Sequence, residues 1–120
     1  MAMTFEAIRK MALALEQVEE STSYGTPAFK VRAALIARLR PELDALVIRM
    51  PIDDRQELIA ADPETYFITD HYLNYPWILV SLSRVHPDAM RDLLKAAWRS
   101  AASEKRRPSK GRRGGKLNRP

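Results

Sequence analysis

Cysteine is absent from the 120 residues of this chain, and histidine occurs only at His71 and His86. Without thiols the protein can form neither disulfides nor thiolate metal sites, which fits a reducing compartment. The two histidines lie far apart in the sequence, so a transition-metal site is not expected. We predict that the protein holds no metal and no other cofactor.

Long hydrophobic runs are missing as well. No apolar stretch approaches the ~18 residues that would span a bilayer. Residues 1–6 include an acid where a signal peptide carries bases. We therefore expect a soluble, cytoplasmic protein that does not act at a membrane.

Glycine is scarce, and the motifs that place catalytic groups are missing with it. Residues 111–116 read Gly-Arg-Arg-Gly-Gly-Lys, but this segment lacks the strand and the helix that flank a phosphate-binding loop. No Gly-x-Ser-x-Gly nucleophile motif occurs. Asp70 and His71 are neighbours on an expected strand, so their side chains would point to opposite faces and not form a catalytic pair. We expect a protein that is not an enzyme, with a weak enzyme using His71 as a base as a further alternative.

Positive charge is concentrated at the C-terminal end. Residues 104–120 contain eight Lys or Arg and one acid, a net charge of +7. The whole chain has 20 bases and 15 acids, which leaves 12 bases and 14 acids, a net −2, in residues 1–103. A segment so basic and so poor in apolar residues cannot bury enough surface to fold alone. We predict one folded domain over residues 1–103 and a disordered basic tail over residues 104–120.

Nucleic acid, and DNA in the first place, is the partner expected for this tail, because a polycation binds phosphates without regard to sequence. The bases concerned are Lys105, Arg106, Arg107, Lys110, Arg112, Arg113, Lys116 and Arg119. The alternative is a tail that only keeps the protein in solution.

The folded part is expected to be an α+β domain with an antiparallel sheet of about five strands packed against helices, in the order α-β-β-β-α-β-β-α. Helical spacing of apolar residues predicts the helices, and alternation predicts the strands. The expected helices are 4–20, 53–61 and one that begins at 86–88, and the expected strands are 24–31, 34–40, 45–50, 66–72 and 77–85. A hairpin is expected around Arg32-Ala33, although its turn lacks the usual Gly or Asn.

The first three strands carry an excess of bases. Regular alternation places Leu35 on the core face of its strand and Ile36 on the outer face, together with Arg38 and Arg40. If these strands are adjacent, their outer positions form a basic sheet face that could contact phosphates. Its members are Lys30, Arg32, Arg38, Arg40 and Arg49. The alternative is an ordinary charged sheet exterior.

A second surface is expected at the turn between the last two strands, where polar-tipped rings and turn residues gather. Its members are His71, Tyr72, Tyr75 and Trp77, and Tyr24, an exposed ring at the start of the first expected strand, is counted with them. Two functional hypotheses follow. The first is a non-enzymatic, sequence-tolerant nucleic-acid binder that uses the tail and the basic sheet face, and the second is a protein-interaction or small-ligand module that uses the second surface.

Three stretches of the sequence are familiar in combination. They read Ser-Tyr-Gly-Thr-Pro-Ala-Phe-Lys-Val at 23–31, Asp-His-Tyr-Leu-Asn-Tyr-Pro-Trp-Ile-Leu-Val at 70–80, and Ala-Ala-Trp-Arg at 96–99. Together they resemble the MmcQ/YjbR family, over about residues 5–102. The resemblance implies a compact fold similar to the CyaY-like, double-wing arrangement, and the family is commonly labelled DNA-binding by likeness to a double-wing transcription factor domain. Such a likeness of fold does not itself carry function.

The positions that match the family pattern are Tyr24, Pro27, Phe29, Lys30, His71, Tyr72, Pro76 and Trp77. None of them is implied to be catalytic. The chain departs from the pattern at Ala33-Ala34, where many members resemble Gly-Lys, and its basic tail lies outside the pattern.

Overall fold

A computed structural model describes residues 3–106 of the chain. Its helices and strands are α1 (Phe5–Leu13), β1 (Val18–Ser23), β2 (Thr26–Val31), β3 (Ala34–Arg40), β4 (Ala45–Arg49), α2 (Ile52–Ala61), β5 (Tyr66–Phe67), β6 (Trp77–Ser81) and α3 (Pro87–Arg106). Short 3-10 turns occupy Pro41–Leu43 and Asp70–Tyr72. The six strands form one antiparallel sheet in the order β1-β2-β3-β4-β6-β5. The α+β class and the antiparallel sheet expected from the sequence are confirmed, with six strands instead of about five.

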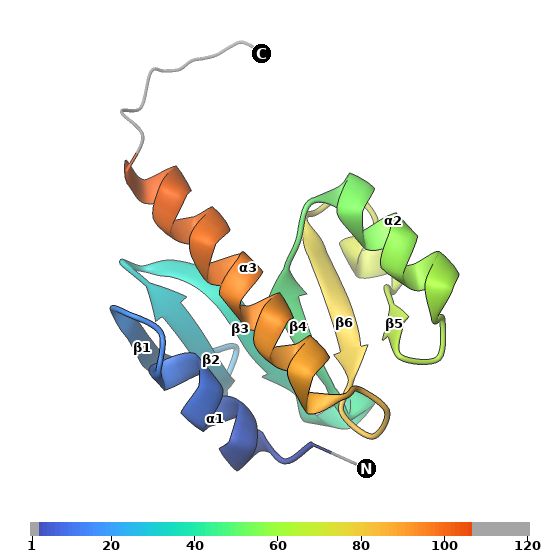
Figure 1. The fold of residues 1–120 in the computed structure, drawn as a ribbon, viewed down its shortest axis with the longest axis horizontal. Coiled ribbons are helices and arrows are strands. Elements are labelled where there is room, and N and C mark those ends of the chain that lie inside the picture. The colour runs from blue at the N-terminus through green and yellow to red at the C-terminus, as the bar shows by residue number, and fades with distance from the viewer. Residues whose placement is uncertain (1–2, 107–120) are drawn as a thin grey trace, which may run out of the picture.

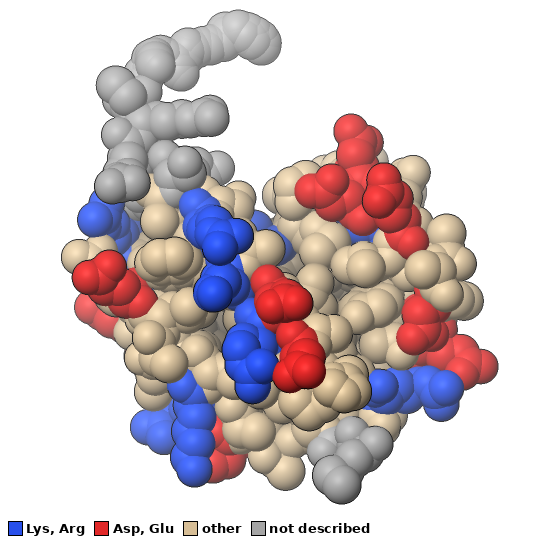
Figure 2. Space-filling view, viewed as in Figure 1, with Lys and Arg blue, Asp and Glu red and all other residues tan. Residues whose placement is uncertain are grey.

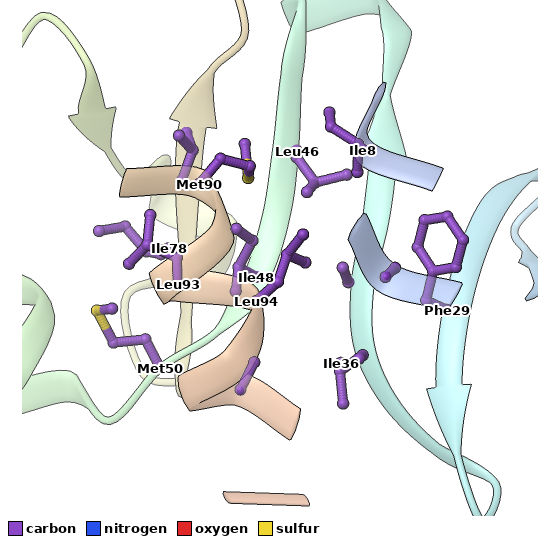
Figure 3. Packing of buried hydrophobic residues seen from close by; sticks show 14 of the residues in the cluster. Ile8, Phe29, Ile36, Leu46, Ile48, Met50, Ile78, Met90, Leu93 and Leu94 are labelled. Carbon is purple, nitrogen blue, oxygen red and sulfur yellow. The ribbon is translucent and has the colours of Figure 1, made fainter. Parts of the chain in front are cut away.

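The main core lies between one face of the sheet and the helices. Helices α1 and α3 cross this face side by side, and α2 lies at the end of the sheet formed by β6 and β5 (Figure 1). Side chains from α1 and α3 meet the inward-facing side chains of the central strands, as Ile8, Leu94 and Ile48 show (Figure 3). These three residues are fully buried. Burying an aliphatic side chain of this size stabilises the fold by about 1.5–3 kcal/mol.

The first helix is shorter than its apolar spacing predicts. We expected a helix over 4–20, but α1 ends at Leu13 and Val18–Ser23 forms β1. Thr4 caps the N-terminus, its Oγ1 accepting a hydrogen bond from the Ala7 N–H at 3.1 Å. Strand β1 pairs with β2 along its whole length. This hairpin pairing satisfies the backbone of a Ser- and Thr-rich segment with low helix propensity.

Most of the expected strand 66–72 is not a strand in the structure. Only Tyr66–Phe67 pairs with β6, and Asp70–Tyr72 forms a 3-10 turn. The strand position predicted for His71 is therefore wrong. Segment 68–77 leaves the sheet after β5, folds back over it and rejoins it at Trp77, the first residue of β6, so the rings of residues 68–76 lie above the strands instead of along them.

A β-bulge in β3 exchanges the sheet faces that were predicted for Leu35 and Ile36. Phe29 of β2 pairs with Ala37, whereas the next residue of β2 pairs with Leu35, so Ile36 is the extra residue. Ile36 and Ala37 both lie in the main core, and Leu35 faces the other side of the sheet. The predicted placement of Leu35 in the core and of Ile36 outside it is therefore wrong, because a bulge breaks the alternation of faces.

The predicted hairpin at Arg32-Ala33 is confirmed. Both residues have positive φ, 51° and 71°, as the type I′ turn requires. The preceding turn between β1 and β2 has the same character, with φ of 53° at Tyr24 and 79° at Gly25. Two successive tight turns thus connect the first three strands.

The last helix begins at Pro87, as expected, and runs to Arg106, three residues beyond the predicted boundary after Ser103. Lys105 and Arg106 thus lie in its last turn. The other six bases of the predicted tail, from Arg107 to Arg119, lie outside the described residues. The tail and the division of the chain at residue 103 stay predictions.

Candidate functional site

A second, smaller core lies on the sheet face opposite α1 and α3. Tyr72 packs over Ala45, Val47 and Leu79 there, and it is only 6% exposed. The side chains of Phe67, Ile68 and Trp77 flank this cluster. The segment 68–77 thus covers the part of this face formed by β4 and β6, and the part formed by β2 and β3 is left open.

A groove with two compartments lies between segment 68–77 and the β1–β2 turn. The apolar compartment has a volume of about 350 Å³ and is lined by Tyr24, Leu35, Arg38, Val47, His71, Tyr72, Tyr75 and Trp77. The polar compartment has a volume of about 660 Å³ and is lined by Tyr24, Thr26, Arg38, Arg40, Glu42, Thr69 and His71. Tyr24, Arg38 and His71 line both compartments, so the two are continuous.

Strand register places three arginines on this face. Arg38 is opposite Val47, and Arg40 is opposite Ala45. Arg49 lies on β4 together with Ala45 and Val47, two residues after Val47. Since alternate residues of a strand share a face, the three arginines share the groove side of the sheet.

Each of the three arginines lies over an aromatic ring. The guanidinium carbon of Arg38 is 5.1 Å from the centre of the Tyr24 ring. The corresponding distances are 5.9 Å from Arg40 to the Tyr72 ring and 5.5 Å from Arg49 to the Trp77 ring. Such cation–π contacts are favourable, and they hold a long side chain in place before any ligand arrives.

The arginines differ in their remaining partners. Arg40 donates from Nε to Glu42 and from one Nη to the Tyr72 hydroxyl, both at 2.6 Å. A hydrogen bond from its own backbone N–H, and then Arg40, lower the pKa of the Glu42 carboxyl, so this acid offsets the charge of Arg40. Arg38 donates to the Thr26 hydroxyl at 3.1 Å, a neutral partner. Arg49 donates to the Leu35 carbonyl at 3.1 Å.

Arg55 of α2 fixes the segment that forms one wall of the groove. Arg55 is 2% exposed, and its two terminal nitrogens donate hydrogen bonds to four backbone carbonyls. The acceptors are Tyr72 at 3.0 Å, Leu73 at 2.7 Å, Tyr75 at 2.6 Å and Trp77 at 2.8 Å. Sequence reasoning missed this residue because nothing in the local pattern distinguishes a buried arginine from one on the solvated side of a helix.

Four of the five predicted members of the basic sheet face lie on the same side of the sheet. Lys30 joins the three arginines, because it alternates with the core residues Phe29 and Val31. Arg32 does not, because it lies in the β2–β3 turn and donates to Gln17 at 2.9 Å. It lines a separate hollow with Trp98 and Ala102 of α3.

The two surfaces predicted from the sequence are one surface in the structure. Tyr24, Tyr72 and Trp77, expected at an alternative site, are the rings beneath the three arginines. His71 and Tyr75 line the same groove, and the His71 ring meets Tyr72 edge-on with centroids 4.8 Å apart. Leu35 and Thr26, which the sequence did not suggest, complete the lining because of the bulge and the tight turn.

The opposite side of the molecule has a mixed charge. Bases and acids both lie along α3, and acidic side chains gather over α2 (Figure 2). Within residues 3–106, no group of three or more His, Asp or Glu side chains is arranged to hold a metal ion. In the same residues, no helix combines the length and the apolar character needed to cross a membrane.

Comparison with known proteins agrees with this architecture. The solved structure of Deinococcus radiodurans protein DR2400, described with the family-model domain DUF419, is similar with a TM-score of 0.71 and 19% sequence identity. The likeness covers 89% of this chain and 91% of that one, and at this identity it shows the fold alone. No curated protein matches the chain. A family model described as YjbR matches residues 13–100, well over half of the sequence, and the chain therefore belongs to the YjbR family.

Proposed function

We propose that the protein binds nucleic acid, with DNA as its partner, and is not an enzyme. The observation that carries this proposal is the set of three arginines on the groove side of the sheet, each over an aromatic ring. A guanidinium offers planar, paired donors that match phosphate oxygens. Because the rings already restrict these side chains, less conformational entropy is lost when a phosphate binds.

The charge distribution supports the same proposal. The groove side of the sheet carries four bases, Lys30, Arg38, Arg40 and Arg49. On the opposite side, acidic side chains gather over α2 (Figure 2). A polyanion is therefore attracted toward the groove and repelled from α2. The bases of residues 105–119 add a second source of phosphate contacts. Phosphate contacts do not read sequence, so binding is sequence-tolerant.

The test is a titration of duplex DNA with the full chain at two salt concentrations. Arg38→Gln removes a charge from the groove, and Arg91→Gln removes a charge from an exposed position on α3 as the matched control. We expect Arg38→Gln to weaken binding more than the control and to lower the salt slope by about 1. Equal effects of the two variants would remove the groove from the proposal.

The tail is tested in the same assay by changing its six bases from Arg107 to Arg119 to Gln, which keeps α3 intact. Since each phosphate contact contributes ~0.9 to the slope of log affinity against log salt, this variant is expected to lose about 5 from the slope if all six bases engage. An unchanged slope would exclude the tail from binding.

The second candidate is a small-ligand or protein-interaction module, favoured by the apolar lining of Leu35, Val47 and Trp77. Substituting His71 and Tyr75 cannot separate it from DNA binding, because both residues share the groove with Arg38. Salt dependence does separate them. Binding in an apolar compartment changes little with ionic strength, whereas binding to phosphates weakens steeply.

A further inference from the structure

The apolar and the polar compartment of the groove match the two chemical parts of a nucleotide, its base and its phosphate. A nucleobase is a flat, largely apolar ring, and it is joined through its sugar to an anionic phosphate. The apolar compartment is lined by aromatic and aliphatic side chains, among them Tyr75, Trp77 and Leu35. The polar compartment presents two arginines, two threonine hydroxyls and the Glu42 carboxylate, which pairs with Arg40 and leaves Arg38 as the arginine without an acidic partner among the lining residues. Arg38 lines both, where the base and the phosphate would join.

We propose that the groove binds single-stranded DNA, by taking an unstacked base into the apolar compartment and its phosphate beside Arg38. This inference rests on the proposed nucleic-acid function and names the class of nucleic acid that the groove binds. The faces of bases in a duplex are covered by their neighbours, so a duplex can offer phosphates but no base face. Proteins that bind single strands combine a basic groove with rings on which bases stack.

The groove is formed before a ligand binds. Four hydrogen bonds from the buried Arg55 hold the backbone of Tyr72, Leu73, Tyr75 and Trp77. On the sheet side, the bond from Arg38 to Thr26 and the contact of Arg38 with the Tyr24 ring fix the other wall. A wall that is already ordered costs little entropy when a flexible strand binds to it.

Tyr24 offers a clean way to test this. Its side chain is 91% exposed and lies outside both cores, and its φ of 53° is a conformation that asparagine adopts more readily. Tyr24→Asn therefore removes a ring from the groove without weakening the turn. Tyr24→Phe keeps the ring and is the matched control.

The experiment compares four probes of equal length: an oligothymidylate, its RNA counterpart, an abasic oligomer with the same phosphates, and a duplex. The full chain whose tail bases are changed to Gln is titrated with each probe, so that the tail does not mask the groove. We expect the oligothymidylate to bind roughly tenfold more tightly than the abasic oligomer, the gain typical of base stacking. Tyr24→Asn should remove most of this difference, and Tyr24→Phe should retain it.

Equal affinity for the oligothymidylate and the abasic oligomer would overturn the inference, and so would tighter binding of the duplex or of an RNA oligomer of the same sequence. If Arg38→Gln still weakened every probe in that case, phosphate binding by the groove would stand and the base compartment alone would fail. If no probe responded to Arg38→Gln, the part of the proposed function that assigns phosphate binding to the groove would fail as well. Thermal unfolding of Tyr24→Asn, expected to match or exceed that of the parent, shows that the fold is intact.

Discussion

The β2–β3 turn is formed by two residues that are poorly suited to it. Arg32 and Ala33 have φ of 51° and 71°, in the left-handed region. This conformation costs roughly 1–2 kcal/mol for a residue with a β-carbon. The family pattern that the sequence resembles has glycine at position 33, where many members read Gly-Lys. The structure gives the physical reason for that glycine, and the turn here forms in spite of the cost.

Ala33→Gly is therefore expected to stabilise the protein. The gain should be about 0.5–1 kcal/mol, because relief of the left-handed strain exceeds the extra entropy that glycine loses on folding. Urea denaturation followed by circular dichroism measures it. The control is Ala34→Gly, one residue later in the extended backbone of β3, which should destabilise the fold. A loss of stability in both variants would contradict the turn geometry.

At the scale of elements, the bulge in β3 decides which side chains line the groove. An uninterrupted strand would bury Leu35 and expose Ile36. The extra residue places Ile36 in the main core, fully buried, and turns Leu35 toward the groove. The arginines that follow the bulge keep the groove side by pairing with β4.

Alanine substitutions at these two adjacent positions should therefore differ strongly. Ile36→Ala leaves a cavity in the core and is expected to cost roughly 2–5 kcal/mol of unfolding free energy. Leu35→Ala removes a half-buried side chain and should cost about 1 kcal/mol. Chemical denaturation of the two variants measures both changes. The reverse order, with Leu35→Ala the more damaging, would show that the bulge is absent.

Helix α2 acts on the groove through one side chain. Arg55 reaches from its first turns to four carbonyls of segment 72–77, and within the described residues it makes no ion pair with an acid. The carbonyl dipoles thus take the place of a carboxylate. A buried guanidinium is tolerated when it is hydrogen-bonded, as both terminal nitrogens of Arg55 are.

Arg55→Leu should leave these carbonyls without donors and destabilise the protein by about 3 kcal/mol. Backbone amides of residues 72–77 should also exchange faster with deuterium. Arg55→Lys keeps the charge with fewer, less directed donors, so we expect an intermediate effect. The neutral comparison is Glu57→Gln on an exposed position of the same helix. Unchanged exchange in Arg55→Leu would mean that the segment is held by other contacts.

At the scale of the whole molecule, the sheet separates two regions that the sequence suggested as one binding surface. The groove lies on one face, and α3, from which the C-terminal bases continue, lies on the other (Figure 1). Arg32, beside the C-terminal half of α3, belongs to the helix side of this division.

Groove and tail should therefore contribute independently to DNA affinity. Combining Arg38→Gln with the tail substitutions is expected to change the binding free energy by the sum of the separate changes, to within about 0.5 kcal/mol, since distant sites without shared partners are additive. Titration of one duplex with the four proteins measures this double-mutant cycle. A larger deviation would show that the tail folds back onto the groove.

Much of the fold follows from local patterns. Apolar spacing identified the position of α3, and alternation identified β2, β3 and β4 and the hairpin between β2 and β3. The errors lie where hairpin pairing overrides the apolar spacing of a helix, as in β1, or where one residue breaks a period, as at Ile36.

Most of the candidate groove residues were also named by the sequence, but as two separate surfaces. Rings such as Tyr24 and Trp77 and bases such as Arg38 are conspicuous by type. Their union depends on segment 68–77 folding back over β4 and β6, which brings His71 and Tyr75 toward a turn nearly fifty residues earlier. Arg55, which holds that segment, has no such conspicuous signal.

The sequence by itself determined the charge of each segment, the lack of thiols, and the periods that make a helix or a strand amphipathic, because these depend only on which residues stand near one another along the chain. The tertiary structure alone decided which faces meet. Strand register, one bulged residue and a buried guanidinium place three arginines over three rings. The physical reason is that hydrogen-bond pairing and packing act between residues distant in sequence, and no local period records them.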